Sequence, residues 1–120
     1  MNKYTELSDF EINLLVAQSV LPETQYDVIK QTMDIIQFLV DGSFGYRFFD
    51  PCNNPSDAMP IIIENEISLI FDTGCKEWAA GDAYWVDGYE WQVGGAVRKN
   101  NPLRAAMEVF LMMKDAENEG

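Results

Sequence analysis

Residues 101–113 read Asn-Pro-Leu-Arg-Ala-Ala-Met-Glu-Val-Phe-Leu-Met-Met, and this stretch predicts the helix on which the rest of the fold packs. Asn101 suits a helix N-cap, and Pro102 then takes the first helical position, where its missing amide costs nothing. Burying a side chain such as Phe110 contributes about 1.5–3 kcal/mol, so we expect a sheet to cover this helix. The apolar residues that recur at helical spacing are Leu103, Ala106, Met107, Phe110, Leu111 and Met113.

A second helix is marked near the start of the chain by a capping box at residues 8–11. In this motif the Ser8 hydroxyl accepts from the Glu11 amide, while the Glu11 carboxylate accepts from the Ser8 amide. Apolar residues follow at helical spacing, and Pro22 ends the element because a residue before proline disfavours the helical conformation. The sequence therefore predicts a helix over residues 9–19.

The clearest strand signal is a hairpin centred on Asp87-Gly88, a dipeptide that favours a tight turn between antiparallel strands. Branched and aromatic residues flank this turn at residues 84–86 and 89–93, as strands require. We expect Gly94-Gly95 to end the second strand. Weaker patterns predict strands, or a strand and a helical turn, at residues 26–29 and 35–40, and a strand at residues 67–71.

The middle of the chain predicts a short helix after a loop at residues 50–57. Asn54 or Ser56 can cap this helix, which is bent at Pro60 and extends to about Asn65. The whole pattern predicts a single α+β domain over residues 1–120. In this fold a small antiparallel sheet packs against an N-terminal and a C-terminal helix. The length of 120 residues and the 48% hydrophobic content are sufficient for one core.

The charge of the chain is strongly negative, with 8 basic and 20 acidic residues and a formal net charge of −12. Between Phe48 and Val97 the only base is Lys76. Such a surface repels phosphate backbones and anionic lipids, so we expect no direct binding to nucleic acid or to a membrane. The acids serve solubility, or they form a face that docks a basic protein or imitates the charge of DNA.

Cysteine usage and the polar N-terminus predict a cytoplasmic protein. Cys52 and Cys75 are the only cysteines, and no signal peptide precedes them, so we expect both thiols to stay reduced. The longest apolar runs, such as residues 61–63, are far shorter than the roughly 20 residues of a membrane span. We therefore expect no transmembrane helix.

Catalytic chemistry has few candidates in this sequence. The chain has no histidine, which excludes catalytic triads and leaves too few ligands for a zinc site. No phosphate-binding glycine motif is present, so we predict no cofactor, no metal and no catalytic residue. Paired carboxylates remain an alternative, since two nearby acids can raise one another's pKa. The pairs in question are Glu64 with Glu66 and Asp82 with Asp87.

The loop before the middle helix supplies one set of candidate site residues: Asp50, Cys52, Asn53 and Asn54. A thiol at a helix N-terminus can be reactive, because the helix dipole lowers its pKa. The alternative, which we favour, is that Cys52 is a small buried residue that fixes the loop. Asn53 and Asn54 are then turn and cap formers.

The hairpin supplies the second set, namely Tyr84, Trp85, Tyr89, Trp91, Asp82 and Asp87, as candidates for binding a partner. Tryptophan and tyrosine dominate the energetic centres of protein interfaces. Only alternate residues of a strand share a face, so Trp85 and Trp91 can be core while the tyrosines face outward, or the reverse. The sequence leaves open whether these rings are core or binding surface.

Three segments carry a resemblance to a known family. They read Asp-Pro-Cys-Asn-Asn-Pro-Ser-Asp-Ala-Met-Pro-Ile-Ile-Ile-Glu-Asn-Glu-Ile-Ser at residues 50–68, residues 101–113 as quoted above, and Glu-Leu-Ser-Asp-Phe-Glu-Ile-Asn within residues 4–16. The chain resembles the NinX-like family of lambdoid phages and prophages. The family pattern has an aromatic residue where Pro51 stands and a tryptophan where Met59 stands. The resemblance implies a small phage accessory protein in the bacterial cytoplasm, and it transfers no catalytic residues.

The sequence as a whole favours a non-enzymatic accessory protein that binds a host or phage protein, which can be basic. The absence of catalytic groups, the acidic surface and the aromatic hairpin motivate this hypothesis. A rival hypothesis is a small-ligand protein or enzyme that uses carboxylates and Cys52. A third is a homodimer whose apolar patch is a subunit interface.

Overall fold

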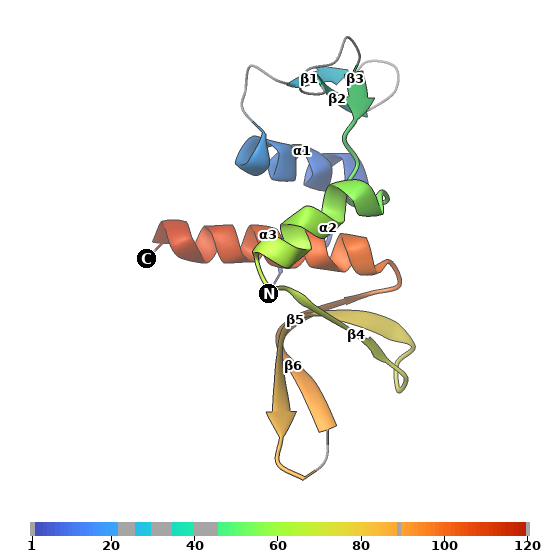
Figure 1. Cartoon of the computed structure of the whole chain (residues 1–120), viewed down its shortest axis with the longest axis vertical. Coiled ribbons are helices and arrows are strands. Elements are labelled where there is room, and N and C mark those ends of the chain that lie inside the picture. Colours follow the sequence, from blue (N-terminus) through green and yellow to red (C-terminus); the bar gives the residue numbers. More distant parts are fainter. Residues whose placement is uncertain (1, 22–25, 30–34, 40–45, 89, 120) are drawn as a thin grey trace.

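The computed structural model describes residues 2–21, 26–29, 35–39, 46–88 and 90–119. Three helices lie between two antiparallel sheets in an elongated molecule of 54 × 28 × 28 Å (Figure 1). The helices are α1 (Asp9–Val20), α2 (Pro55–Glu64) and α3 (Pro102–Glu119). The strands are β1 (Tyr26–Ile29), β2 (Ile35–Leu39), β3 (Tyr46–Phe48), β4 (Ser68–Asp72), β5 (Glu77–Val86) and β6 (Glu90–Lys99).

The α+β class is confirmed, with helices near both ends of the chain and a short helix in the middle. The strands are divided between two sheets, whereas the sequence predicted one. Strands β1, β2 and β3 form one sheet beside α1, and β4, β5 and β6 form a second sheet against α3 (Figure 1). Each sheet has its strands in chain order, because short connections favour antiparallel neighbours.

Helix α3 lies at the centre of the hydrophobic core, as its apolar stripe predicted. Asn101 caps it, because its Oδ1 accepts from the Leu103 amide at 2.9 Å. Helices α1 and α2 and strands β5 and β6 all contact α3, so one helix joins most of the fold. The buried side chains that meet there include Ile12, Val16, Ile62, Ala80, Val97, Met107, Phe110 and Leu111.

The local signals at the starts of the other two helices are confirmed. At α1 the Glu11 amide donates to Ser8 Oγ at 3.1 Å, and the Ser8 amide donates to Glu11 Oε1 at 2.9 Å. At α2 the cap is Asn54, whose Oδ1 accepts from the Ser56 amide at 3.0 Å. Pro60 lies inside this helix at its sixth residue, where it removes one intrahelical amide donor, while Pro55 takes the first helical position at no such cost.

The hairpin is longer than the sequence predicted, since β6 does not end at Gly94-Gly95 but continues to Lys99. The two glycines lie at a β-bulge instead. Ala80 pairs with Val97 and Asp82 with Gly94, so two residues of β6 oppose one residue of β5. Gly95 takes a φ of +61°, which glycine adopts without the cost that a side chain imposes. In this chain the glycine pair therefore forms a β-bulge within strand β6 and does not end the strand.

Gly81 sits opposite this bulge, where the two backbones approach too closely for a side chain. A Cβ added to Gly81 would lie 2.5 Å from the Gly94 carbonyl oxygen and 2.8 Å from Val93 Cγ1. Because the nearest atom is backbone, it cannot move aside as a flexible side chain can. The absence of a side chain at Gly81 is therefore a condition for the pairing of β5 with β6.

We predict that Gly81→Ala lowers the free energy of unfolding by about 1–3 kcal/mol, the usual cost of forcing atoms into a packed site. Gly94→Ala is the matched control, since its Cβ would make only ordinary contacts, the nearest with Tyr84 Cε1 at 3.4 Å. That variant should stay within about 0.5 kcal/mol of wild type. Urea denaturation followed by far-UV circular dichroism measures both, and equal losses would contradict the close approach.

Candidate functional site

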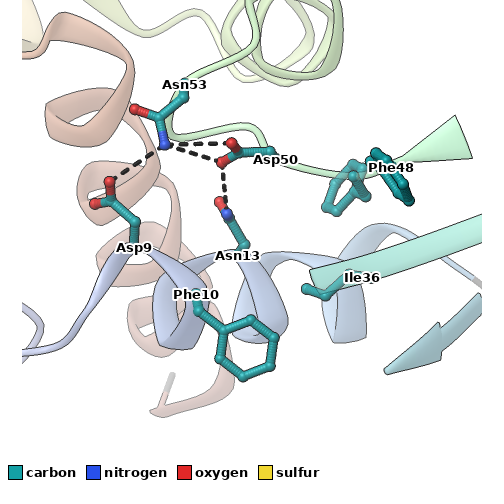
Figure 2. Close-up of a pocket in the computed structure, with 8 residues that line it drawn as sticks. Asp9, Phe10, Asn13, Ile36, Phe48, Asp50 and Asn53 are labelled. Atoms are coloured by element: carbon teal, nitrogen blue, oxygen red, sulfur yellow. Dashed lines mark hydrogen bonds between the residues drawn. The ribbon is translucent and has the colours of Figure 1, made fainter. Parts of the chain in front are cut away.

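The loop that carries the first set of candidates is fixed onto α1 by Asn13, a buried residue. Its Nδ2 donates to Asp50 Oδ1 at 2.7 Å (Figure 2). Its Oδ1 accepts from the Cys52 amide at 3.0 Å. The Asp50 amide in turn donates to Asp57 Oδ2 at 3.0 Å. These bonds satisfy polar groups that would otherwise be costly to bury, so they hold the loop in one conformation.

Asn53 lies between two carboxylates and holds them together. Its Nδ2 donates to Asp9 Oδ2 at 3.2 Å and to Asp50 Oδ1 at 3.1 Å (Figure 2). Asn101 joins the same network, because its Nδ2 donates to the Cys52 carbonyl oxygen at 2.6 Å. The loop asparagines therefore act as turn and bridging residues, and the cap of α3 is tied to the loop.

Arg104 makes four hydrogen bonds, three of which connect α3 to the N-terminal part of the chain. Its Nη1 donates to Asp9 Oδ1 at 2.7 Å and its Nε to Glu108 Oε2 at 2.6 Å. Its Nη2 donates to the carbonyl oxygens of Tyr4 and Leu7 at 3.0 and 2.7 Å. Burial opposes the charge of Arg104, but the bonds to Asp9 and Glu108 outweigh it and raise the pKa of the guanidinium above its ordinary value.

Glu108 is fully buried, so hydrogen bonds and ion pairs within the protein must stabilise its carboxylate. Beside the bond from Arg104, its carboxylate lies 3.7 Å from Lys99 Nζ and accepts from Asn2 Nδ2. An isolated buried carboxylate would be expensive, whereas a paired and hydrogen-bonded one is tolerated. This network therefore joins β6, α3 and the N-terminal segment.

A pocket of about 250 Å³ opens between α1, the loop and the first sheet (Figure 2). Two carboxylates that line it, Asp9 and Asp50, already accept hydrogen bonds from Arg104, Asn13 and Asn53. Both carboxylates therefore help to hold the loop, and each already has a hydrogen-bond donor from the protein. The apolar side chains that line the pocket are Phe10, Ile36, Phe48 and Phe49.

Cys52 is fully buried in this region, and its thiol lies 3.9 Å from the Asp9 carbonyl oxygen. Burial raises the pKa of the Cys52 thiol far above its ordinary value, and the nearby charge of Asp9 acts in the same direction. The thiol therefore stays protonated at neutral pH, whereas a nucleophile requires the thiolate. This geometry supports the interpretation of Cys52 as a buried residue that fixes the loop.

We predict that Ellman's reagent modifies only one of the two thiols in the native protein. Cys75 is exposed in the turn between β4 and β5 and should react quickly, while Cys52 should react only after the protein unfolds. Cys75→Ser is the control, because it should remove the fast reaction completely. Rapid modification of that variant under native conditions would show that Cys52 is accessible.

The buried ion pair gives a second prediction. Arg104→Met should lower the free energy of unfolding by about 3–5 kcal/mol, because it leaves Glu108 buried without its closest cation. Glu108→Leu should cost less, because Arg104 keeps its bonds to Asp9 and to two carbonyl oxygens. The double variant should lose clearly less than the sum, since the buried carboxylate that Arg104→Met leaves without its closest cation is no longer present. Urea denaturation of the four proteins measures this cycle, and additive losses would mean that the two side chains act independently.

The second set of candidates lies on the hairpin, which extends away from the helices at one end of the molecule (Figure 1). Trp85 and Trp91 are directly opposite each other on β5 and β6, with ring centroids 5.6 Å apart in an edge-to-face arrangement. Their side chains are 52% and 59% exposed. Tyr84 is also exposed, on the other face, where its hydroxyl donates to Gln92 Oε1 at 3.3 Å.

The expectation that one face of this hairpin is core is therefore wrong for the described residues, because aromatic side chains on both faces are exposed. Tyr84, Trp85 and Trp91 are surface residues, and Tyr89 lies outside the described residues. Asp82 and Asp87 are exposed as well. The structure places all of these described candidates on the hairpin, and it does not bring them near the loop candidates.

The sequence analysis missed the residues that hold the loop and the N-terminal segment, namely Asn13, Arg104 and Glu108. A signal was present for each of them. Asn13 follows Ile12 on the apolar side of α1, and Arg104 and Glu108 are four residues apart within the stripe of α3. A polar residue among core positions indicates a buried hydrogen bond, because burial without one is costly. Glu64 and Glu66, which the sequence offered as a possible carboxylate pair, are both exposed.

Within the described ranges, no cluster of three or more histidine, cysteine, aspartate or glutamate side chains could hold a metal ion. No helix in the same ranges is long and apolar enough to cross a membrane. Fold and surface together define a small acidic α+β protein with an exposed aromatic hairpin.

The chain matches the family model described as "Bacteriophage P22, NinX" over residues 3–114, and it belongs to this family. The resemblance seen in the sequence is confirmed, and it makes the protein an accessory protein of phage. Comparison with curated proteins and with solved structures found no significant match.

Proposed function

We propose that this chain is a non-enzymatic protein-binding module that acts in the cytoplasm of the bacterial host. Its β5–β6 hairpin binds a host or phage protein. The observation that carries the proposal is the cross-strand pair of Trp85 and Trp91, each more than half exposed at the end of a hairpin that leaves the core. Tryptophan contributes strongly to binding when a partner covers it.

The strand pairing gathers apolar side chains on one face of this hairpin. Ala83 pairs with Val93, two residues before the tryptophan pair, so all four side chains lie on the same face. Exposed apolar residues are common singly, but a contiguous group rimmed by polar side chains marks an interaction site. We call this group of Ala83, Trp85, Trp91 and Val93 the tryptophan face.

Carboxylates on the hairpin favour a partner with a basic surface, with Asp87 in the turn and Asp82 and Glu90 on the face opposite to the tryptophans. Asp82, Asp87 and Glu90 are exposed on the hairpin. Complementary charge speeds encounter and suppresses wrong partners. Exposed acids also occur on α1, α2 and α3, so they do not form one ridge, and this distribution does not favour imitation of DNA.

The test is capture of a partner from phage-infected cells with tagged protein. Replacing both tryptophans, in Trp85→Ser/Trp91→Ser, should reduce the amount of the captured partner by about tenfold or more, because hot-spot residues contribute roughly 2 kcal/mol or more. Ile63→Ser is the matched control, since Ile63 is an apolar side chain that is 67% exposed on α2, away from the hairpin. Quantitative mass spectrometry measures the captured protein.

Two outcomes would contradict the proposal. One is equal capture by the tryptophan variant and the wild type, with both proteins folded by circular dichroism. The other is a concentration-dependent dimer in light scattering that Trp85→Ser/Trp91→Ser abolishes, which would make the tryptophan face a subunit interface. In that case the homodimer hypothesis would replace the proposal.

A small-ligand protein is a second candidate, favoured by the pocket beside Asp50 and Asn53. Cys52 does not contribute a thiolate to such a site, because its thiol is buried. A thermal-shift screen of nucleotides, sugars and divalent metals tests this candidate, since a ligand of the native state raises its stability. A reproducible shift that Asn53→Ala removes would support it.

A further inference from the structure

We propose that the free edge of β6 is a docking site for a second copy of this chain. The β6 strands of two copies pair in antiparallel orientation about a two-fold axis, so their three-stranded sheets join into one continuous sheet. This interface uses the main chain of a strand edge. It is therefore separate from the proposed function, which uses the side chains of the tryptophan face.

Strand β6 forms one edge of the sheet that it shares with β4 and β5. Among the described residues, β6 pairs only with β5, and no backbone hydrogen bond links it to another segment. Alternate residues of an edge strand point their amide and carbonyl groups away from the sheet, where another strand can bind them. The edge of β6 therefore offers the main-chain groups that strand addition requires.

The sequence of β6 lacks the residues that usually protect a sheet edge. Residues 91–97 contain no charged residue and no proline, so charge is confined to the two ends of the strand. Proteins commonly block an exposed edge with a lysine or a proline within the strand, or keep the edge strand very short. With ten residues, β6 is as long as its neighbour β5. The edge is thus long and uncharged at its centre.

A groove beside β6 gives a second strand room to approach. Its volume is about 430 Å³, and residues 95–99 of β6 line it. The other lining residues are Asn2 and Thr5 of the N-terminal segment and Met112 of α3. The N-terminal segment and α3 therefore flank this part of the edge without filling the space next to it.

The β-bulge decides which side chains of β6 share a face. Side chains alternate along a strand, and the extra residue at Gly94-Gly95 shifts this alternation by one position. The face that carries the tryptophans therefore holds odd-numbered residues before the bulge and even-numbered residues after it. On β6 this face presents Trp91, Val93, Ala96 and Arg98.

One register matches these faces along the whole strand. When the bulges of two copies meet at the two-fold axis, residues 90–93 of each β6 pair with residues 96–99 of the other. Trp91 then lies opposite Arg98 of the second copy, on the face of the tryptophans. A bulge disturbs the ladder when only one strand has it, whereas here both strands have the extra residue at the same level. A shift by one residue would place side chains of one face opposite those of the other.

The charges of β6 favour this antiparallel pairing of two identical strands. One end of the strand carries the acid Glu90, whose Oε1 accepts from Gln92 Nε2 at 3.4 Å, and the other end carries the bases Arg98 and Lys99. Glu90 of each copy lies opposite Lys99 of the other, and opposite charges on facing strands stabilise a sheet. A parallel arrangement would place like charges side by side. The strand therefore contains both halves of a complementary pattern, which a second copy matches.

These charges set the direction of pairing and contribute little affinity, because both bases already contact acids of their own chain. Arg98 Nε lies 3.5 Å from Asp72 Oδ2, and Lys99 Nζ lies 3.7 Å from Glu108 Oε2. The affinity comes from main-chain hydrogen bonds and from the uncharged centre of the strand, where no charge has to be desolvated. In the joined sheet the tryptophan faces of both copies lie on the same side, so the dimer presents two of them to a partner.

The first experiment is sedimentation velocity of the full chain over a wide range of concentrations, at about 0.15 M salt to screen the repulsion between two acidic chains. We expect a reversible equilibrium between monomer and dimer. Ala96→Lys should abolish the dimer while circular dichroism shows an intact fold, because a lysine within an edge strand blocks strand addition. A chain that stays monomeric at every concentration would overturn the proposal. So would a dimer that Trp85→Ser abolishes and Ala96→Lys leaves intact.

A charge reversal tests the direction of pairing. Glu90→Lys puts a lysine opposite Lys99 at both ends of the paired strands and should weaken the dimer by about tenfold, since two favourable contacts become unfavourable. Glu64→Lys is the matched control, because it makes the same change in net charge on the exposed end of α2. It lowers the general repulsion and should not weaken the dimer. Equal weakening by the two variants would contradict the pairing.

Disulfide formation tests the register. Val93→Cys and Ala96→Cys are prepared as separate proteins, each with Cys75→Ser to remove the exposed native thiol. Directly opposite residues of an antiparallel pair have Cβ atoms about 4.5–5.5 Å apart, near the reach of a disulfide. Oxidation of the mixture should therefore give a covalent dimer with one copy of each variant. Cross-linking of either variant alone, without the mixed dimer, would show that the strands pair in another way and that this proposal is wrong.

Discussion

The buried charge of Arg104 is the constraint on which the rest of the structure depends. A guanidinium with little exposure must be neutralised and hydrogen-bonded, and Glu108, Asp9 and two carbonyl oxygens of the N-terminal segment do this. Because those groups come from both ends of the chain, satisfying one side chain fixes the N-terminal segment against α3. The apolar contacts of α3 supply most of the free energy of folding, while this ion pair specifies how the segments are arranged.

The network also divides the acids of this protein into two groups with different roles. Asp9, Asp50, Asp57 and Glu108 accept hydrogen bonds inside the body and hold the loop and the N-terminal segment. The acids on the hairpin lie outside this network and contribute negative charge to the surface of the hairpin. The net charge of −12 therefore combines structural carboxylates with carboxylates that are available to a partner.

Much of the fold was predictable because its signals are local. The capping box at Ser8, the cap at Asn101 and the turn at Asp87-Gly88 each depend on residues within a few positions, and each is found where it was predicted. The extension of β6 past Gly94-Gly95 was not predictable in this way. A glycine pair can end a strand or form a bulge, and the choice depends on how β5 and β6 pair across the sheet.

The sequence by itself determined the α+β class, the three helices, the position of the hairpin and the family, because these follow from periodicity, caps and motifs. Only the tertiary structure decided which side chains are surface and which are core. Trp85 and Trp91 are exposed because the hairpin leaves the body, while Cys52 is buried because Asn13 and Asn101 hold its loop against the helices. Burial depends on contacts between segments far apart in the chain, and no local pattern specifies them.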